Sequence, residues 1–345
     1  MAAAAPTLFS LPSTVPRLAD SHGRTIHDLR VSITDRCNYK CVYCRTGELG
    51  AQYPELAIDE YLRLIAVFVG LGITKVRLTG GEPLLRRGLV DLVRDLSRLR
   101  TLGGDPLDLA LTTNGHLLES LAQSLKDAGL NRVTVSMDAV DAPTFERITR
   151  VESSFSKVLA GIRAARAAGL TPLKINCVLL RGFNDDQIEG FARFARAENV
   201  VVRFIEFMPL EEGRLWTPGI VVTLREIVER IGRTLPIVEL PPREASETAR
   251  RYTFADGVGE IGIIAPVSQA FCGACSRVRL TSDGKIRTCL FSQVEHDLYG
   301  RLRAGAGDEE LRAYIVQTIQ GKEARHHIGE PGFLKPSRSM VHIGG

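Results

Sequence analysis

Short apolar runs that alternate with polar residues recur along the chain, and amphipathic stretches separate them. Six of the runs are typical of strands, at residues 29–34, 75–79, 107–113, 132–138, 173–179 and 201–208. Helical periodicity follows them, for example at 59–70 and 184–198, where we expect Asp59 and Asn184 to act as N-caps. Strands that alternate with helices indicate repeated βα units and a parallel sheet.

One face of each predicted strand is polar. In the first strand Arg30, Ser32 and Thr34 share a face, whereas Val31 and Ile33 share the other. Because crossover helices must cover the apolar face, the polar face turns inward if the sheet curls. A closed eight-stranded barrel is filled with branched apolar side chains, so a polar interior predicts a wider or incomplete barrel around a polar ligand. An open antiparallel-type sheet with one solvated face is the alternative.

Basic side chains from separate strands lie on this predicted inner face. They are Arg30, Lys75, Arg77, Lys174 and Arg203. Together they could converge on one strongly anionic group such as a triphosphate. Any one of them alone could be an ordinary ion-pair partner.

Composition narrows the class of protein only slightly. The 345 residues leave room for about two domains, or for one barrel with an extension. The net charge of +4 is too small to indicate nucleic acid or an anionic membrane. The longest apolar run, at 64–73, is shorter than the roughly 20 residues that span a bilayer. Residues 1–15 are rich in Ala, Pro and Ser and lack the features of a secretory signal, so we expect a flexible lead-in.

The cysteines carry the strongest chemical signal. Seven cysteines occur in groups of three, one and three, which suits a reducing compartment better than a disulfide framework, so we expect a cytoplasmic protein. The first group, C-x3-C-x2-C, is formed by Cys37, Cys41 and Cys44 in a polar loop. Three thiolates without a fourth predict an iron-sulfur site with one iron open to a substrate. A zinc-stabilised loop or three buried structural thiols is the alternative.

The second group has the spacing C-x2-C-x13-C and is formed by Cys272, Cys275 and Cys289. It again lacks a fourth cysteine, although a zinc ribbon completed by His296 would fit. Arg277 and Arg279 follow it at a period of two. An open metal site beside two guanidiniums suits a second ligand that is anionic or heteroaromatic.

Loops at the carboxyl ends of the strands should carry the chemistry of such a fold. The second strand ends in Gly80-Gly81-Glu82-Pro83, where the glycines let the backbone approach a ligand and Glu82 can accept a cationic amine. The third strand ends in Thr112-Thr113-Asn114-Gly115 and the fourth in Ser136-Met137-Asp138, which place hydroxyls and amides at the rim.

Taken together, these motifs resemble a known family. The chain is similar to the GTP 3',8-cyclases of molybdenum cofactor biosynthesis, which are radical S-adenosylmethionine enzymes. The motifs that carry this resemblance are the first cysteine loop, the GGEPLLR run, SMDA, RFIEFM, the CGACSRVRL segment, TCLF and a Gly-Gly end. The resemblance covers residues 20–345. It implies an α/β fold with a flexible lead-in at 1–24 and an incomplete (β/α)6 barrel of TIM type at 25–245. It also implies a C-terminal iron-sulfur domain at 246–345, which closes the barrel mouth and ends in the Gly-Gly tail.

The same resemblance implies two four-iron clusters. The first, on Cys37, Cys41 and Cys44, cleaves S-adenosylmethionine, and the second, on Cys272, Cys275 and Cys289, binds the purine of GTP. S-adenosylmethionine contacts fall on Tyr43, Gly80, Gly81, Glu82, Ser136 and Met208. GTP contacts fall on Arg30, Lys75, Arg77, Thr112, Lys174, Arg203, Arg277, Val278 and Arg279. Gly344 and Gly345 reach into the active site and belong, with Arg277 and Arg279, to the catalytic set.

In this family a 5'-deoxyadenosyl radical takes hydrogen from ribose C3', and the carbon radical attacks C8 of guanine to give 3',8-cyclo-7,8-dihydroguanosine 5'-triphosphate. The resemblance implies three partners: a reductant protein, the downstream cyclic pyranopterin monophosphate synthase and a second copy of the chain in a homodimer. No nucleic-acid or membrane partner is expected.

The chain departs from the family pattern at two places. Arg45-Thr46 follows the third cysteine where Met-Pro is usual, which could alter the potential of the cluster, and His22 stands where an aromatic residue is usual. Two other functions stay open: a two-cluster radical enzyme that acts on a peptide, and a zinc-dependent nucleic-acid-binding module.

Overall fold

Six strands, each followed by one or two helices, form the first two thirds of the chain. The computed structural model describes residues 17–45 and 50–344. The repeating part consists of β1 (Asp28–Ser32), α1 (Ile58–Val69), β2 (Lys75–Thr79), α2 (Leu89–Ser97), β3 (Asp108–Thr113), α3 (Leu118–Asp127), β4 (Arg132–Ser136), α4 (Ala142–Thr149), α5 (Ser154–Ala167), β5 (Lys174–Leu179), α6 (Ile188–Ala197), β6 (Val201–Glu206) and α7 (Leu224–Thr234).

The remaining third adds strands to both ends of this series. Its elements are β7 (Ile237–Leu240), β8 (Arg250–Phe254), β9 (Glu260–Ile264), β10 (Arg277–Leu280), β11 (Lys285–Arg287), β12 (His296–Asp297), α8 (Leu298–Arg303), α9 (Asp308–Gln320) and α10 (Met340–Ile343). All the strands belong to one sheet of twelve in the order β12-β11-β10-β1-β2-β3-β4-β5-β6-β9-β8-β7.

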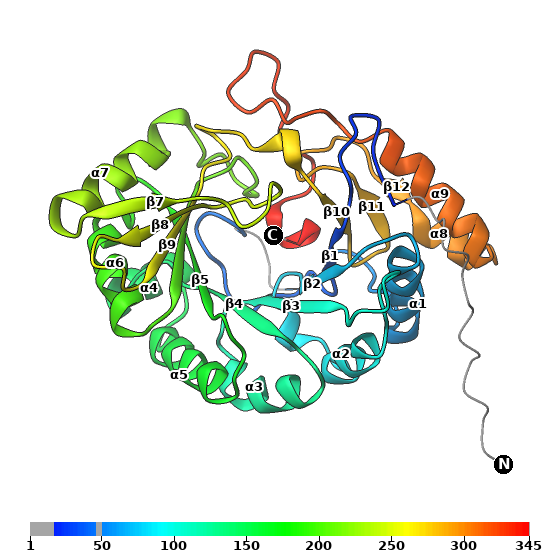
Figure 1. Ribbon diagram of the computed structural model, residues 1–345, viewed down its shortest axis with the longest axis horizontal. Coiled ribbons are helices and arrows are strands. Elements are labelled where there is room, and N and C mark those ends of the chain that lie inside the picture. The colour runs from blue at the N-terminus through cyan, green and yellow to red at the C-terminus, as the bar shows by residue number, and fades with distance from the viewer. Residues whose placement is uncertain (1–16, 46–49, 345) are drawn as a thin grey trace.

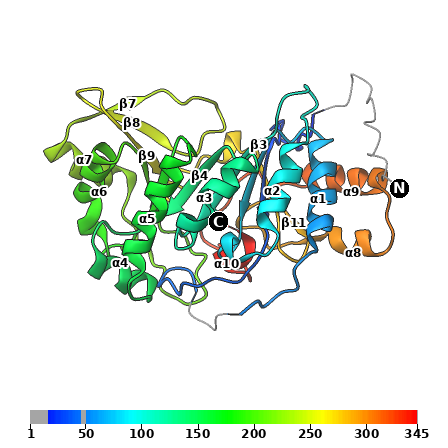
Figure 2. The same ribbon diagram turned by 90° about the horizontal axis from the view of Figure 1, so that it is seen from below.

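The sheet curls into an open ring. From β10 through β1–β6 to β9 the neighbours pair in parallel, whereas the outermost pairs on each side are antiparallel. Because β12 and β7 are the two ends of the strand order, the barrel is incomplete. Helices α1–α7 surround the ring, and α10 lies inside it (Figures 1 and 2). The predicted incomplete barrel is confirmed, and the antiparallel alternative is wrong.

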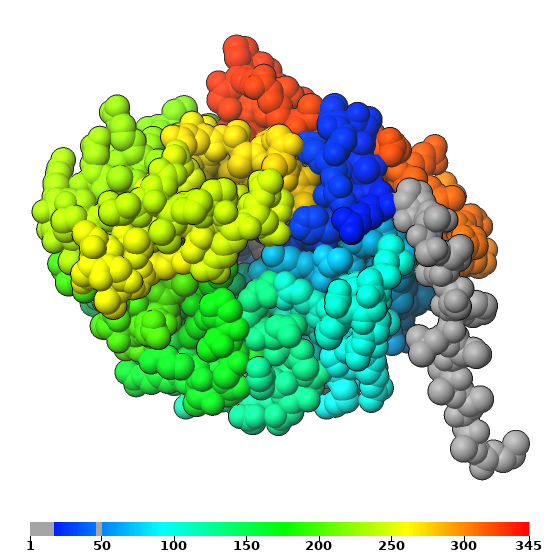
Figure 3. Space-filling view, in the orientation of Figure 1, coloured from blue at the N-terminus to red at the C-terminus, as the bar shows by residue number. Residues whose placement is uncertain are grey.

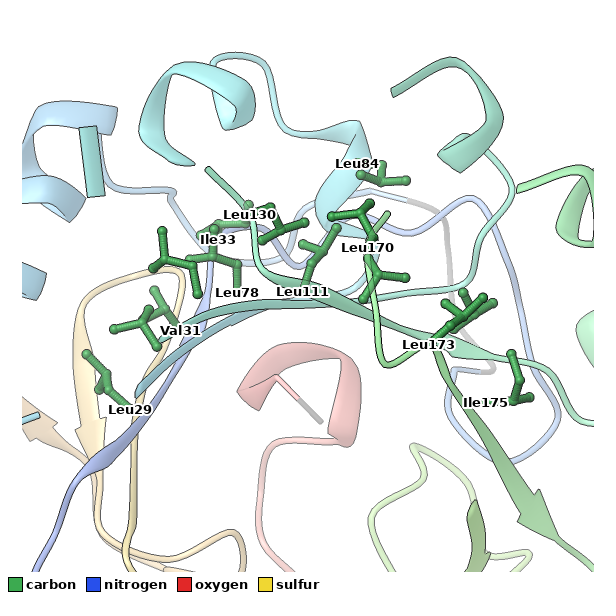
Figure 4. Close-up of a cluster of buried hydrophobic side chains, with 14 of the residues drawn as sticks. Leu29, Val31, Ile33, Leu78, Leu84, Leu111, Leu130, Leu170, Leu173 and Ile175 are labelled. Carbon is green, nitrogen blue, oxygen red and sulfur yellow. The ribbon is translucent and has the colours of Figure 1, made fainter. Parts of the chain in front are cut away.

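The apolar face of the strands builds the core against the helices. Leu29, Val31 and Ile33 of the first strand segment are fully buried in the main hydrophobic cluster, and Leu78 and Leu111 join them from β2 and β3. In Figure 4 these side chains lie on the side of the strands away from α10. The alternation read from the sequence is therefore confirmed, and the polar positions face the interior of the ring.

The ends of the elements differ from the prediction at several points. β1, β4 and β6 end two residues earlier than expected, because the chain leaves the sheet to form the rim loops. Asp59 does not cap α1, whose N-cap is Ala57. Asn184 does not cap α6 either: its side-chain amide donates to the carbonyl oxygens of Asp138 and Val178, which ties two neighbouring strand ends together.

The predicted division at 25–245 and 246–345 stays a prediction, because the sheet runs across it without a break. Residues 1–16 of the predicted lead-in lie outside the described residues, as does Thr46. The rest of the lead-in packs on the fold: Leu18 is buried, and the Arg24 guanidinium pairs with Asp20 at 2.5 Å.

Candidate active site

One cavity of about 300 Å³ occupies the inside of the ring. Residues from every strand of the parallel series, β10, β1–β6 and β9, line it together with residues of the C-terminal segments. The surface is hollowed near the middle of the face in Figure 3. Of the predicted site residues, those that line the cavity are Cys37, Cys41, Cys44, Cys272, Cys275, Cys289, Tyr43, Gly80, Gly81, Ser136, Met208, Arg30, Arg77, Thr112, Arg203, Arg277 and Arg279.

The first three cysteines lie on the loop that follows β1. Backbone hydrogen bonds from Lys40 and Val42 to the end of α4 hold this loop across the carboxyl end of the barrel. Burial raises the pKa of Cys37 to about 11, that of Cys44 to about 12 and that of Cys41 well above its usual value. Negative charge on Cys37 raises the pKa of both Cys41 and Cys44 further, so a bound cationic group would stabilise the thiolates.

The two glycines of the GGEP turn allow close contact with this loop. A Cβ on Gly80 would lie 2.3 Å from the Thr34 carbonyl oxygen, and one on Gly81 would lie 2.3 Å from that of Arg36. The Gly81 N–H donates to Thr34 at 2.8 Å. The glycines therefore join the turn to the cysteine loop while they line the cavity, which only glycine permits here.

Glu82 has a different position from the one expected. Its carboxylate is fully buried and accepts hydrogen bonds from the Thr113 hydroxyl and from the N–H groups of Leu84 and Asn114. Burial raises its pKa to about 7. Among the described residues it is not part of the cavity lining. Glu82 thus supports the turn, and its predicted contact with a cationic amine stays a prediction.

The side chains next to the first cysteines are fixed by internal contacts. The Tyr43 hydroxyl donates to Asp138 Oδ2 at 2.7 Å, and Asp138 Oδ1 accepts from the Val178 N–H. Burial raises the pKa of Asp138 to about 6. Ser136 and Met208 line the same region. This pocket beside the open side of a three-cysteine site is suited to a ligand of the size of S-adenosylmethionine.

The second three cysteines lie at the opposite end of the barrel. Cys275 precedes β10, which pairs in parallel with β1 from Asp28 onward, whereas the first cysteine loop follows β1. Cys289 follows β11, which returns antiparallel to the same end. Since a five-residue strand spans about 17 Å, the two sites face each other across the cavity.

Basic groups surround the second site. The Lys322 ammonium is buried and donates to the carbonyl oxygens of Arg277 and Thr288. Burial would raise the pKa of Cys275, but Arg277 and Lys322 lower it to about 7. The pKa of Cys289 is raised by burial. A cluster here would have several cationic neighbours, whereas Arg45 is the cation that acts on the described thiols of the first site.

Arginines line the space between the two sites. Arg77 donates to the hydroxyls of Thr112 and Thr134 at 3.2 and 3.3 Å, and Arg203 donates to Asn176 at 3.0 Å. Burial and mutual repulsion lower the pKa of Arg77 to about 10 and that of Arg203 to about 9, so both stay protonated at neutral pH. Such an excess of buried positive charge requires an anionic ligand.

The two predicted lysines flank this group without lining the cavity described here. Lys174 begins β5, and burial followed by repulsion from Arg203 lowers its pKa to about 8. Lys75 begins β2 and lies 3.9 Å from a carboxylate oxygen of Glu244. Both stand at the amino ends of their strands, on the side of the second cysteine site. Val278 is different, because its side chain is buried in the outer core and only its backbone faces inward.

The C-terminal tail enters the barrel. Gly344 is buried at φ +70°, and its carbonyl oxygen accepts a hydrogen bond from Arg279. A Cβ on Gly344 would lie 2.7 Å from Thr79 Cγ2, so a glycine fits where a larger residue would clash. Gly345 lies outside the described residues.

The donor set fits two iron-sulfur clusters better than a single ion. Within the described part of the chain, no three Cys, His, Asp or Glu side chains are close enough to hold one metal ion. A zinc ion needs its ligands at about 2.0 to 2.3 Å, whereas each thiolate of a four-iron cluster binds a different iron and stands farther from the others. The seventh cysteine, Cys177, is buried in the core and does not line the cavity.

Several lining residues carried no sequence signal. Phe271, Lys322 and His326 reach the cavity from C-terminal segments outside any motif, and Asn176 supports Arg203 from β5. Asn176 is the exception, because strand alternation places it on the polar inward face together with Lys174, as the structure confirms. The others depend on contacts between distant parts of the chain. Within the described residues, none of the helices has both the length and the apolar character needed to cross a bilayer.

A three-cysteine loop at the carboxyl end of an incomplete (β/α)6 barrel defines a radical S-adenosylmethionine protein. The family model described as Radical SAM superfamily matches residues 31–195, and the one described as Molybdenum Cofactor Synthesis C matches residues 200–328. A GTP 3',8-cyclase of Moorella thermoacetica is 44% identical over 335 residues, which cover 95% of this chain and 100% of the relative. The chain belongs to the GTP 3',8-cyclase family.

A second relative supports the same family, and a solved structure supports the fold. A GTP 3',8-cyclase of Peptoclostridium acidaminophilum is 41% identical over 333 residues, 95% of this chain and 98% of the relative. The crystal structure of SuiB from Streptococcus suis matches with a TM-score of 0.61 at 14% identity, over 87% of this chain and 68% of that one. At that identity the likeness shows the fold alone.

Proposed function

We propose that this chain converts GTP to 3',8-cyclo-7,8-dihydroguanosine 5'-triphosphate, the first step of molybdenum cofactor biosynthesis. The observation that carries the proposal is the single cavity with a three-cysteine site at each end and buried arginines between them. Relatives at 41 to 44% identity over nearly the whole chain are named GTP 3',8-cyclase. The basic interior gives such a nucleotide its phosphate contacts, which a peptide substrate would not need.

The residues around the first site hold the cofactor. Cys37, Cys41 and Cys44 would bind a four-iron cluster, and Tyr43, Gly81, Ser136 and Met208 would enclose S-adenosylmethionine beside it. When bound together, cluster and S-adenosylmethionine supply a 5'-deoxyadenosyl radical. The chain contributes position: Asp138 fixes Tyr43, and the GGEP turn fixes the loop.

The residues at the other end orient the substrate. Cys272, Cys275 and Cys289 would hold the second cluster beside the purine, with Arg277 and Arg279 next to it. Arg30, Arg77, Arg203, Lys75 and Lys174 would bind the triphosphate. The buried tail at Gly344 closes the cavity near Arg279 and excludes water from it.

Further partners and the compartment follow from this chemistry. A low-potential reductant protein supplies the electron for the first site, and the cyclic pyranopterin monophosphate synthase consumes the product. We infer a homodimer and a cytoplasmic location, the latter because the seven cysteines are unpaired thiols that suit a reducing compartment.

Anaerobic reconstitution tests the proposal. The purified protein is expected to be brown, to carry two four-iron clusters, and to form the cyclised nucleotide from GTP, S-adenosylmethionine and a reductant, as read by mass spectrometry. A colourless protein that binds zinc, or a brown one that cleaves S-adenosylmethionine without using GTP, would contradict it.

A further inference from the structure

Arg45 is a buried cation that forms no ion pair with a carboxylate in the part of the chain that the structure describes. It follows Cys44 directly, and its side chain is 1% exposed. Within the described residues, no Asp or Glu oxygen lies within ion-pair distance of its guanidinium. Its Nε–H has no acceptor. Burying a charge without a counter-charge is costly, so an unpaired guanidinium here requires a compensating negative group.

The position of Arg45 is fixed by the backbone. Nη1 donates to the Asp35 carbonyl oxygen at 3.1 Å and Nη2 to that of Gly50 at 2.7 Å. Asp35 precedes the first cysteine loop and Gly50 follows it, so the guanidinium bridges the two ends of the loop. The Asp35 carboxylate forms no ion pair with it: Oδ2 accepts from the N–H groups of Gln52 and Tyr53, and Oδ1 is buried without a hydrogen-bond partner. Arg45 therefore holds its charge beside the three thiols and lines the same cavity.

A comparison with a second buried arginine, Arg287, shows in what respect Arg45 is unusual. Arg287 is also 1% exposed and also has an Nε–H without an acceptor, but its guanidinium pairs with Glu295 at 2.6 Å. Its charge is thus neutralised within the protein. Among the described residues, the Arg45 guanidinium donates to neutral carbonyl oxygens. Its charge acts on the cysteine site, because it lowers the pKa of Cys37 and Cys44 against the rise that burial causes.

We propose that Arg45 is a positioning residue for the electrostatics of the first cluster and raises its reduction potential. Reduction adds one electron, taken from a low-potential one-electron donor, to a group that is already anionic. A fixed positive charge in a poorly solvated site stabilises the reduced form more than the oxidised form. The proposal rests on the proposed function, because it requires a four-iron cluster on Cys37, Cys41 and Cys44.

The test is a potentiometric titration of the reconstituted holoenzyme followed by electron paramagnetic resonance. The signal of the first cluster is identified by its change when S-adenosylmethionine is added. Arg45→Met keeps the length of the side chain but removes charge and donors, Arg45→Gln keeps donors, and Arg45→Lys keeps the charge. Arg36→Gln is the matched control, because Arg36 also adjoins a cluster cysteine but its side chain is 63% exposed, so solvent screens its charge.

The midpoint potential is expected to shift to more negative values in Arg45→Met and Arg45→Gln, and to stay near the wild-type value in Arg45→Lys and Arg36→Gln. Because a guanidinium does not titrate, the difference between wild type and Arg45→Met should stay constant from about pH 6.5 to 8.5. A difference that varies over this range would assign the effect to a titrating neighbour such as His342, and would overturn the proposal.

Two further results would also overturn it: a wild-type midpoint in Arg45→Met, or an equal shift in Arg36→Gln. If the neutral variants lose their iron, the midpoint potential of Arg45→Lys decides whether the charge matters. An unchanged midpoint in that variant supports the proposal, and a shift to more negative potential contradicts it. A wild-type protein without any signal that responds to S-adenosylmethionine would refute the proposed function itself, which separates the two failures.

Discussion

The two cysteine sites of this protein have the same number of thiols and opposite surroundings. At the first, burial and neighbouring anionic groups such as Asp138 and Glu82 raise the pKa of the thiols. At the second, Arg277 and Lys322 lower the pKa of Cys275 to about 7. The first site has carboxylates and the single described guanidinium of Arg45 around its thiols, whereas the second belongs to a basic region. The difference suggests that one end of the cavity holds the cofactor and the other holds an anionic substrate.

Removing either set of cysteines should separate the two roles most strongly. Replacing Cys37, Cys41 and Cys44 with Ala is expected to remove about half the iron and all cleavage of S-adenosylmethionine, because the first cluster has no other thiol ligands nearby. Replacing Cys272, Cys275 and Cys289 should also remove about half the iron, but leave cleavage measurable while abolishing product from GTP. Iron content and 5'-deoxyadenosine formation check both; equal behaviour of the two triple variants would contradict distinct roles.

Shortening the tail should produce the next largest effect. Deleting Gly344 and Gly345 removes the acceptor of the Arg279 hydrogen bond and opens the cavity. We expect intact clusters and an unchanged melting temperature, but much less product per S-adenosylmethionine cleaved. Gly344→Ala should act in the same direction, since its Cβ would meet Thr79 Cγ2 at 2.7 Å. A truncated enzyme with the full-length ratio and rate would show that the tail does not complete the site.

Positive charge at the basic end of the cavity should strengthen the binding of the triphosphate and contribute little to the binding of the nucleoside. Lys174→Ala is expected to weaken GTP binding by about 1.5 to 3 kcal/mol, or about 10- to 150-fold, because a charge-assisted contact is lost. Guanosine, measured in the same calorimetric titration, should bind almost equally to both proteins. Lys126→Ala on the outer helix α3, where the lysine is exposed, is the control. Equal losses for GTP and guanosine would remove Lys174 from the phosphate site.

A smaller effect on the affinity for GTP is expected when the pH is changed. The pKa of Lys174 is lowered to about 8, chiefly by burial, so its ammonium is largely protonated at pH 7 and largely neutral at about pH 9. The last ionisation of a phosphate group has a pKa of about 6, so the triphosphate is mostly fully ionised at pH 7 and gains rather than loses negative charge at higher pH. GTP affinity should therefore fall as the pH rises through about 8, and Lys174→Gln should flatten the profile. A wild-type profile in this variant would assign the dependence to another group.

The sequence predicted those parts that depend on short-range periodicity. Strand alternation placed Arg30, Arg77 and Arg203 inside the barrel, because side chains of a strand must alternate between its faces. Cysteine spacing marked both three-cysteine sites, whose residues line the cavity. Helix caps were less predictable, since the side chain of Asn184 bonds to other strand ends instead of a helix.

Long-range contacts could not be predicted at all. Lys322 lies 45 residues from Arg277, whose carbonyl oxygen it contacts, and no motif surrounds it. Glu82 showed a related limit: the motif identified the turn, but only the fold shows that its carboxylate is satisfied by Thr113, Leu84 and Asn114. Buried polar groups choose partners by proximity in space, which local patterns do not encode.

The central claim is that a radical formed at the first site reaches a GTP molecule held at the second. Incubation with GTP that carries deuterium at ribose C3' tests it most directly, with S-adenosylmethionine and a reductant under anaerobic conditions. The account predicts that deuterium appears in 5'-deoxyadenosine and that the GTP becomes the 3',8-cyclised nucleotide. Formation of 5'-deoxyadenosine without deuterium, while the GTP is recovered unchanged, would contradict it.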